Sequence, residues 1–504
     1  MQRPLYVLVT SLCLLLIACG PSSHRGSCTG ADCNAGSCSA GDSRQCYPGL
    51  ASTEGVGPCV GGNQSCTSAG QWGDCVGAVL PVAENCSDGI DNNCNGMVDE
   101  NIDADGDGFS TCPGVAGGGD CCDSTECSNP AAVNPGAFDV PGDGVDNDCD
   151  GTPDNTALLC DQGLMSNSLM GMDFAKAIDI CQTATMNDKK WGVISAALTL
   201  PDGTGVPDPV SHSIRAHFGT NVLPQGGVNL ALLSSGAAAG KGDANPAYHD
   251  WISYTSSLSS PIPADFLAAN GGNLPNAPGC PAPLDGAAND PVMLTLSIRV
   301  PTNAHSFSIK SNFFSAEFPE FTCTFFNDFF VILLDSSYAG TPANPPDKNL
   351  AFYTQPGTMM KFPVGVNLAF GNTGLFTQCM NGSTGCSGQA PGMISTCVST
   401  QQLAQTGFDD PSPSDCDSNS LKGGGTGWLT TSGNVRPGEI MKLRIAIWDT
   451  SDHLWDSLAA IDAFSWSADG SDPGTVILKT DQPNNPMAVE SVRVPLQSSS
   501  LLQP

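Results

Sequence analysis

The stretch KLRIAIW, Lys442–Trp448, alternates polar and apolar residues at its start and lies within the longer run IMKLRIAIWD, 440–449. LTLSIRV, 294–300, shows the same period of two. Successive side chains of a β-strand point to opposite faces of a sheet, so this alternation is typical of a strand with one buried face. Both stretches therefore predict β-strands.

Further short apolar runs surround these two and are separated by Gly, Pro and Asn. They are WGVISAALTL (191–200), VMLTLSIRV (292–300), SFSIKSNFF (306–314), FFVILLD (329–335) and NLAFYT (349–354). Many short strands with such punctuation predict an antiparallel β-sandwich, similar to a jelly roll. SLMGMDFAKAIDICQT, 168–183, predicts one amphipathic helix with Asp173 near its start.

The charge of the whole chain restricts its partners. Its 504 residues include 50 acidic and 18 basic ones, a formal net charge of −32. Nucleic acids and anionic lipid surfaces require patches of Lys and Arg, so this balance argues against both as partners. It suits a surface protein and leaves many carboxylates available to hard cations.

The N-terminus has the pattern of an export signal. One basic residue, Arg3, precedes an apolar run from Leu5 to Ile17, which is short for a spanning helix and right for a cleaved signal peptide. LIAC, ending at Cys19, resembles a bacterial lipobox. The resemblance implies cleavage before Cys19 and a lipid on its sulfur, with two or three acyl chains as a stable anchor. The alternative is a plain signal peptide with an incidental Cys.

Anchoring through this lipid would be the only contact with the membrane. No later segment is long and apolar enough to span a bilayer, and Gly20, rather than Asp, follows Cys19. We therefore expect an exported protein, lipid-anchored in the outer membrane and exposed at the cell surface.

Cysteine usage agrees with export. Of 24 Cys, Cys13 and Cys19 fall in the signal and lipobox; sixteen lie in Cys28–Cys181 and six in Cys280–Cys416. Both counts are even, as a disulfide framework in an oxidising compartment gives. Zinc is disfavoured because no CxxC pair is present.

Composition divides the chain into segments. Residues 38–83 are rich in Gly, Ser and Cys and cannot bury a large core, so they require disulfides. The expected order is a signal peptide (1–18), a flexible tether (19–37), a Cys-rich disulfide module (38–83), acidic metal-binding repeats (84–156), a β-sandwich domain (157–470) and a C-terminal extension (471–504).

The acidic segment repeats a spacing known from EF-hand loops. Such loops place oxygen ligands at positions 1, 3 and 5, a Gly at 6 and often an oxygen at 9. The matching residues are Asp91, Asn93, Asn95, Gly96 and Asp99, then Asp103, Asp105, Asp107 and Gly108, then Asp146, Asp148, Asp150, Gly151 and Asp154. One copy could be a solvated acidic turn, but three copies favour metal binding.

Calcium is the cation that these ligands suit. It accepts six to eight hard oxygens, whereas Mg²⁺ demands a stricter octahedron and retains its waters. None of the loops has the bidentate Glu at position 12; Ile102 and Gly114 stand there in the first two. We therefore expect weak calcium binding, with Kd on the order of 0.1–1 mM. The expected fold is mainly β: a disulfide-rich, calcium-loop stalk followed by the antiparallel sandwich with one or two helices.

The same segment resembles a known family. ENCSDGIDNNCNGMVDE (84–100), DADGDGFSTC (103–112) with GDCCD (119–123), and NPGAFDVPGDGVDNDCDGTPD (134–154) resemble the metal-binding repeats of bacterial surface proteins related to MopE. The resemblance implies calcium, and a disulfide between Cys86 and Cys94. It does not imply copper binding or catalysis. Pro141 stands where the later copy should have its first Cys, so Cys149 requires another partner.

The remainder of the chain resembles a second family. FGTNVLPQGGVNLALLSSG (218–236), SFSIKSNFFSAEFPEFTCTFFNDFFVILLD (306–335) and GTGWLTTSGNVRPGEIMKLRIAIWDTSDHLWDSLAAIDAFSW (425–466) resemble the choice-of-anchor L domain. The similarity spans roughly residues 190–467 (marked by these motifs). It implies a surface-displayed β domain of unsettled molecular function.

Several polar residues interrupt the apolar motifs of this domain: Glu317, Glu320, Asn327, Asp328, Asp449, Asp452 and Asp456. They could form a cation or carbohydrate site, or they could cap turns and strand ends. The Phe-rich stretch 313–330 and the Trp residues are expected to be mainly core rather than a ligand platform.

Catalytic motifs are weak in this sequence. His212 and His217 do not form HExxH, and no GxSxG elbow, P-loop or dinucleotide fingerprint is present. We expect a lipid-anchored, calcium-stabilised surface protein whose β domain binds a polysaccharide or a cell-surface protein, with no nucleic-acid partner. The alternatives are an exported, glycosidase-like hydrolase that uses carboxylates of the β domain, and a purely structural spacer.

Overall fold

The computed structural model describes residues 28–29, 37–82, 84–85, 88–100, 103–112, 119–123, 129–155, 159–283, 286–371, 373–386, 393–413, 416 and 420–477. The expected signal peptide, Cys19, Cys86 and most of the expected C-terminal extension lie outside these residues. The chain divides into two compact units, one reaching residue 102 and including 111–113, the other formed by 103–110 and everything from 114 onward. The first acidic loop belongs to the former unit, and the second and third loops belong to the latter.

The first unit is a small sheet held by disulfides. Strand β2 (Ser43–Tyr47) pairs in parallel with β1 (Cys28–Thr29) and antiparallel with β3 (Gly62–Ser65). Its apolar cluster contains little more than Tyr47, Cys59 and Cys94. With so little apolar area to bury, the unit depends on covalent links, Cys38–Cys66, Cys46–Cys75 and Cys59–Cys94.

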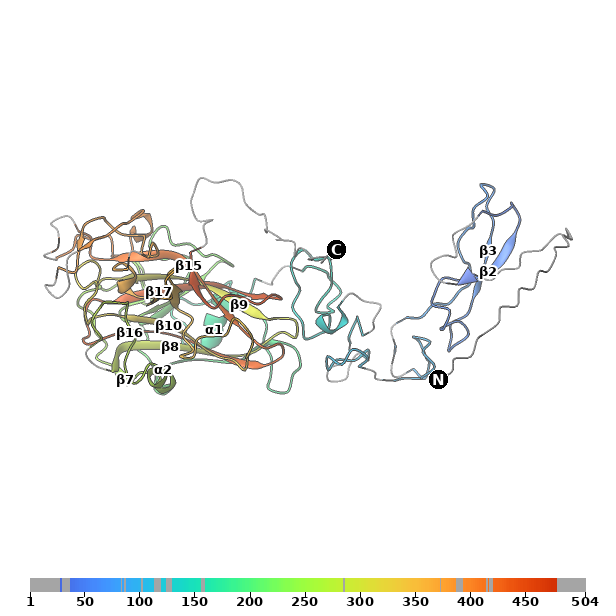
Figure 1. The fold of residues 1–504 in the computed structure, drawn as a ribbon, viewed down its shortest axis with the longest axis horizontal. Coiled ribbons are helices and arrows are strands. Elements are labelled where there is room, and N and C mark those ends of the chain that lie inside the picture. Colours follow the sequence, from blue (N-terminus) through green and yellow to red (C-terminus); the bar gives the residue numbers. More distant parts are fainter. Residues whose placement is uncertain are drawn as a thin grey trace, which may run out of the picture. The chain divides into compact units, whose positions relative to one another are not determined.

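The second unit contains two large antiparallel sheets (Figure 1). The five-stranded sheet has the order β10 (Phe329–Asp335), β16 (Ile440–Asp449), β8 (Ala287–Arg299), β4 (Gly192–Thr199), with β7 (Ser259–Pro261) also paired to β8. The six-stranded sheet has the order β18 (Gly474–Val476), β15 (Gly424–Asn434), β9 (Ser306–Ser315), β17 (Ser457–Ser467), β6 (Leu230–Ser234), β5 (His212–Arg215).

The two sheets pack face to face around one core. Leu294 and Leu296 of β8 and Ile445 of β16 face Ile309 of β9 and Ile461 of β17 within a single buried cluster. Burial of this area, at roughly 25 cal/mol per Å² of apolar surface, is the main term that stabilises the sandwich. The expectation of a mainly β chain with an antiparallel sandwich and a disulfide-rich N-terminal region is confirmed.

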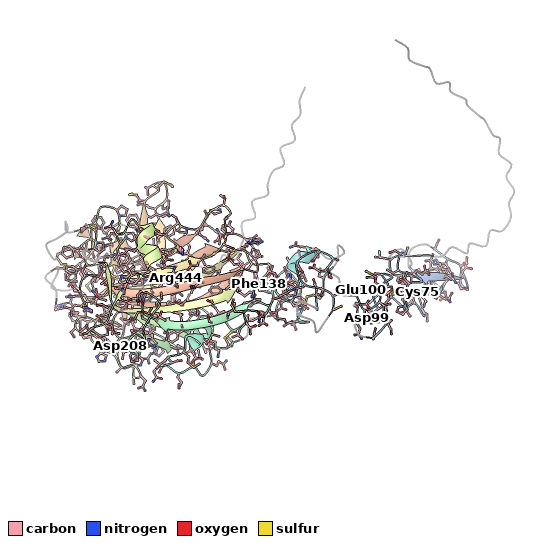
Figure 2. All side chains as sticks on the ribbon, turned by 90° about the horizontal axis from the view of Figure 1, so that it is seen from below. Cys75, Asp99, Glu100, Phe138, Asp208 and Arg444 are labelled. Atoms are coloured by element: carbon pink, nitrogen blue, oxygen red, sulfur yellow. A yellow bond between two sulfur atoms is a disulfide. The ribbon has the colours of Figure 1, made fainter. Side chains whose placement is uncertain are left out.

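Apolar residues also cover both outer faces of the sandwich. Helix α2 (Ala264–Ala269) places Phe266 against Met293 and Trp448 on the five-stranded sheet. Arg444, on the same sheet (Figure 2), donates to both carboxylate oxygens of Asp265 in α2, at 3.0 and 2.6 Å. Because this second layer covers the outer face of the strand, the residues toward the end of KLRIAIW are apolar on both faces.

The Phe-rich stretch is largely core, as the sequence predicts. Phe313, Phe318 and Phe330 lie between the sheets, and Phe314 lies in the cluster on the outer face of the six-stranded sheet. Short strands and 3₁₀ turns complete the unit: β11 (Phe352–Thr354), β12 (Lys361–Pro363), β13 (Ser383–Thr384), β14 (Met393–Ile394), η2 (Pro130–Ala132), η3 (Val366–Leu368) and η4 (Gln401–Leu403).

The helix expected over 168–183 is wrong in extent. Helix α1 covers only Gly171–Ala177. Asp179 then adopts a left-handed conformation with φ of 71°, which turns the chain out of the helix. Cys181 is held by Cys160, and Thr183 bridges to Val193 of β4, so tertiary links end the helix where periodicity alone would continue it.

The cysteines of the sandwich pair among themselves. The bonds are Cys280–Cys323, Cys379–Cys397 and Cys386–Cys416, which use all six cysteines of this region. Among the described helices, none has the length and apolar character needed to cross a bilayer.

Candidate metal sites in the acidic segment

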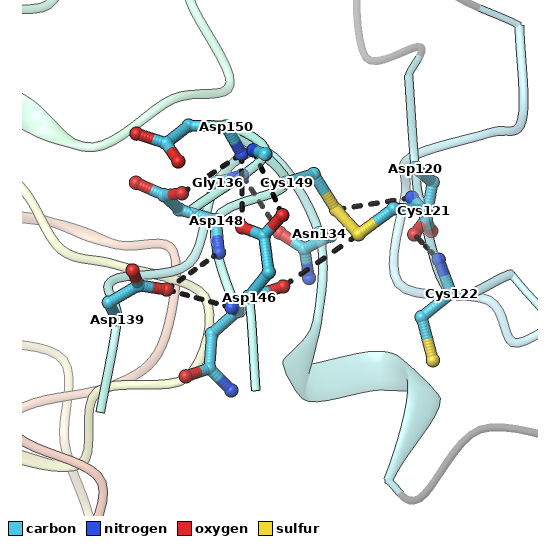
Figure 3. The surroundings of a disulfide bond; sticks show 12 residues. Asp120, Cys121, Cys122, Asn134, Gly136, Asp139, Asp146, Asp148, Cys149 and Asp150 are labelled. Carbon is cyan, nitrogen blue, oxygen red and sulfur yellow. Dashed lines mark hydrogen bonds between the residues drawn. A yellow bond between two sulfur atoms is a disulfide. The ribbon is translucent and has the colours of Figure 1, made fainter. Parts of the chain in front are cut away.

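The third acidic loop folds around its own carboxylates (Figure 3). Asp146 accepts the backbone N–H of Asp150 at 3.1 Å and of Gly151 at 2.9 Å through its two oxygens. Asp148 accepts the same Asp150 N–H at 3.1 Å, and Asp150 accepts that of Thr152 at 2.8 Å. Gly151, with φ of 96°, supplies the turn that position 6 requires. The alternate oxygens therefore converge on one side of the loop.

Three carboxylates meet in this loop. One oxygen from each of Asp139, Asp146 and Asp148 lies within 4.8 Å of the others. Burial, followed by the charges of Asp139 and Asp150, raises the pKa of Asp148 to about 6. A cation bound here would lower the pKa of Asp148, because it stabilises the ionised form of every ligand.

The first loop repeats this geometry 55 residues earlier in the chain. Asp91 accepts the N–H groups of Asn95 at 3.0 Å and Gly96 at 2.9 Å, as Asp146 does in the third loop. The left-handed residues also correspond: Cys94, Gly96 and Asp99 match Cys149, Gly151 and Asp154. Asp99 accepts the N–H of Gly89, and Asp154 accepts that of Gly144, so the ninth position closes each loop against the preceding turn.

The EF-hand spacing does not predict one further carboxylate in each of the first and third loops. Glu84 accepts the N–H of Asn93 at 3.0 Å, and its counterpart Asp139 accepts those of Asn147 and Asp148 at 2.7 and 3.3 Å. Both lie seven residues before the first ligand, outside the EF-hand spacing. Aligning the two copies at their 55-residue offset would have found them, because an acidic residue precedes the loop by the same distance in both.

The second loop recruits carboxylates from a later segment. Asp103 accepts the N–H groups of Gly106 at 2.7 Å and Gly108 at 3.0 Å. Asp105 and Asp107 accept in turn from the residue two positions ahead. Asp123 then accepts the N–H of Asp105 at 3.3 Å and also that of Ala104. The loop is therefore completed by residues that no local spacing rule includes.

The cluster formed by Asp105, Asp120 and Asp123 fits a cation. One oxygen from each lies within 4.8 Å of the others, and Asp103, Asp105 and Asp107 form a second such group. The Oδ2 atoms of Asp105, Asp120 and Asp123 are buried and have no hydrogen-bond partner in the described part of the chain. Burial, then the charges of Asp107, Asp123 and Asp105, raises the pKa of Asp120 to about 7. Buried carboxylate oxygens without donors are the coordination that a hard cation supplies.

The disulfides of these loops differ from the expected pairing. The Cys86–Cys94 bond implied by the resemblance is wrong, because Cys94 is bonded to Cys59 of the Cys-rich module. The Sγ of Cys94 is buried beside Tyr47 and Cys59, with the two Cα atoms 6.2 Å apart. The expectation that Cys149 requires another partner is confirmed, since it bonds Cys121 beside the second loop (Figure 3).

The candidate residues of the β-sandwich are mostly buried rather than exposed. Glu317, Asn327, Asp328, Asp449 and Asp456 are each at most 2% exposed, Glu320 is 5% exposed, and Asp452 is half-buried. Glu320 accepts the hydroxyl of Ser412 at 2.6 Å. A glycosidase would hold two carboxyls about 5–9 Å apart at an open cleft. Burial of this kind does not provide that cleft.

A comparison with protein families supports the metal-binding interpretation of the loops. Residues 81–100 and 128–155 match the Cu-binding MopE family model, described as a "putative metal-binding motif". No curated protein and no solved structure matches the chain. The matched ranges contain the first and third loops, with Glu84 and Asp139 inside them. Residues 81–100 and 128–155 are therefore similar to the motif of this family.

Proposed function

We propose that this chain is an exported, lipid-anchored surface protein whose acidic loops bind Ca²⁺ and whose β-sandwich binds a polysaccharide or a neighbouring cell surface. The observation that carries the proposal is the matched geometry of the first and third loops. In two segments 55 residues apart, the first carboxylate of the loop accepts the same two backbone N–H groups, those of the fifth and sixth positions. Such agreement is expected of a ligand-binding loop and not of an arbitrary acidic turn.

Calcium suits these loops better than the transition metals do. The converging ligands are carboxylate and amide oxygens, with no His or free thiolate in the described clusters. Oxygen sets of this kind select Ca²⁺, Mg²⁺ or Mn²⁺, and the flexible coordination of Ca²⁺ tolerates the absent Glu at position 12. Kd on the order of 0.1–1 mM is the range that extracellular modules use.

The proposed role of the sandwich rests on its resemblance to the choice-of-anchor L domain, on the resemblance of LIAC to a lipobox, and on the disulfides. A choice-of-anchor L domain would be displayed outside the cell, and a lipid on Cys19 would hold it there. The bonds within the sandwich, such as Cys280–Cys323, fit an oxidising compartment. The hydrolase alternative is less favoured because its candidate carboxyls are buried.

Calorimetric titration of the oxidised chain with CaCl₂ tests the loops. We expect saturable binding of two or three ions, reduced by at least one in the double variant Asp91→Ala/Asp146→Ala. The matched control is Asp202→Ala/Asp472→Ala, which removes the same charge from two exposed carboxyls of the sandwich. If wild type binds no ion at several millimolar calcium, or if both double variants lose binding equally, the loops are acidic turns without a metal.

A further inference from the structure

Four buried carboxyls meet at one end of the sandwich, two from each sheet. Asp328 immediately precedes β10 and Asp449 ends β16, and these strands pair with Phe329 opposite Trp448. Glu317 follows β9 and Asp456 precedes β17, where Ser315 is opposite Ser457. The backbone N–H of Ala316 donates to the carbonyl of Asp456 at 3.0 Å, which fixes the second pair.

The four side chains lie close to one another in the folded chain. Glu317 Oε2 accepts the N–H of Asp328 at 3.2 Å. Asp328 lies beside Asp449, and the charge of Asp328 acts on both Asp449 and Asp456. The pairing of the strands therefore brings residues more than a hundred positions apart into one cluster.

These carboxyls lack the partners that burial demands. Asp328 and Asp456 are fully buried and Asp449 is 1% exposed. Neither oxygen of Asp456 has a hydrogen-bond partner among the described residues, and the carboxyl of Asp449 lies against that of Asp328. None of the four carboxyls forms an ion pair within that same part of the chain. An isolated buried carboxylate is strongly unfavourable, so each must either remain protonated or ligate a cation.

The electrostatics of the cluster agree with this requirement. Burial, followed by the charge of Asp328, raises the pKa of Glu317 well above its usual value, and the pKa of Asp449 rises for the same two reasons. A bound divalent ion would lower the pKa of both carboxyls, because it stabilises the ionised form of every ligand.

The surroundings supply further oxygen atoms and close packing. The hydroxyls of Thr450 and Ser457 are buried, and that of Ser457 lies beside Asp328. Gly236, two residues after the end of β6, lies so close that a Cβ atom there would be 2.4 Å from Asp456 Oδ2. Its φ is not in the left-handed region, so the glycine is explained by this close approach rather than by a turn.

We propose that Glu317, Asp328, Asp449 and Asp456 bind one divalent cation of the calcium class, which links the two sheets at this end of the sandwich. The ligands are oxygen only, as hard cations require. This site is separate from the acidic loops and is absent from the residues that the family model matches.

The test uses the full oxidised chain in a background that disables the loops, Asp91→Ala/Asp105→Ala/Asp146→Ala, because Asp105 belongs to both carboxylate groups of the second loop. Calcium and terbium binding are measured after dialysis, by metal analysis and by terbium luminescence excited through tryptophan. Trp448 and Trp455 adjoin the cluster in sequence, so terbium there should be sensitised. The added pair Asp328→Asn/Asp449→Asn is compared with the charge-matched pair Asp202→Asn/Asp472→Asn.

We expect the background to bind one ion, which the Asp328→Asn/Asp449→Asn pair abolishes and the control pair retains. If the background binds no ion, the proposal is overturned and the carboxyls are protonated. An ion that remains bound in the Asp328→Asn/Asp449→Asn variant also overturns the proposal. If the variants fail to fold, hydrogen exchange of the wild-type chain, measured with and without calcium, still tests the site. Calcium should slow exchange at 316–328 and 449–457, and unchanged exchange there contradicts the site even if the loops bind calcium.

Discussion

His212 shows how a single buried group imposes a pH dependence on the sandwich. The imidazole lies in β5, is 1% exposed and packs edge-on against Phe174 at 5.6 Å between ring centroids. Burial lowers its pKa from 6.5 to about 4, so the folded protein holds it neutral. The unfolded chain protonates it near pH 6.5, and folding therefore loses stability as the pH falls below that value.

The variant His212→Gln should remove this dependence. The difference between the free energies of unfolding of wild type and variant should be constant above pH 7. It should then fall by up to about 3 kcal/mol between pH 6.5 and pH 4, since one pKa unit corresponds to about 1.4 kcal/mol. Urea denaturation at several pH values measures this difference. A difference that does not change with pH would show that the pKa of His212 is the same in the folded and the unfolded chain.

At the scale of elements, the two matched acidic loops show what a repeat preserves. Each has an anion seven residues before its first ligand that accepts backbone N–H groups of the loop. Groups that orient ligands in this way commonly change metal affinity 10–100-fold when they are lost, and Asp139 is also one of the three carboxylates that could hold the ion. The loops therefore depend on Glu84 and Asp139 as well as on the residues of the EF-hand spacing.

Replacing Asp139 tests this dependence. In Asp139→Asn, we expect calcium affinity of the third loop to fall about tenfold or more. Asp143→Asn is the control, because Asp143 is exposed, belongs to the same loop and accepts only the local N–H of Val145 among its described bonds. Calorimetry on both variants gives the comparison. Equal losses would mean that net charge alone matters and that the position of Asp139 does not.

The sequence predicted the strands with strong alternation and missed those with weak patterns. GGTGWLTTSGN of β15 and SLAAIDAFSWS of β17 are rich in Gly, Ser and Ala, which have low strand propensity, and tertiary pairing with β9 makes them strands. The carboxyls of the second loop show the same limit. Asp103, Asp105 and Asp107 follow a spacing rule, whereas Asp120 and Asp123 join them only through the fold.

For the molecule as a whole, the net charge of −32 opposes compaction. In calcium-free buffer, added NaCl should raise the thermal midpoint modestly, because salt screens exposed like charges. Calcium should raise the midpoint further at equal ionic strength, because each occupied site adds about 1.4 kcal/mol to the free energy of unfolding at ten times Kd. Calorimetric melting with CaCl₂ against matched NaCl separates the two effects. Identical shifts would indicate screening alone.

The disulfides at Cys94 and Cys149 also restrict the backbone of the two proposed calcium loops. Each cysteine is the fourth residue of its loop, is left-handed, and bonds a cysteine outside the loop, Cys59 or Cys121. In a reducing cytoplasm both links would be open, and ordering either loop would cost more conformational entropy. The nascent chain would then pass through the cell without sequestering calcium. If the chain is exported and its loops bind Ca²⁺, as proposed, maturation would be sequential, with the disulfides formed first and the cations bound second.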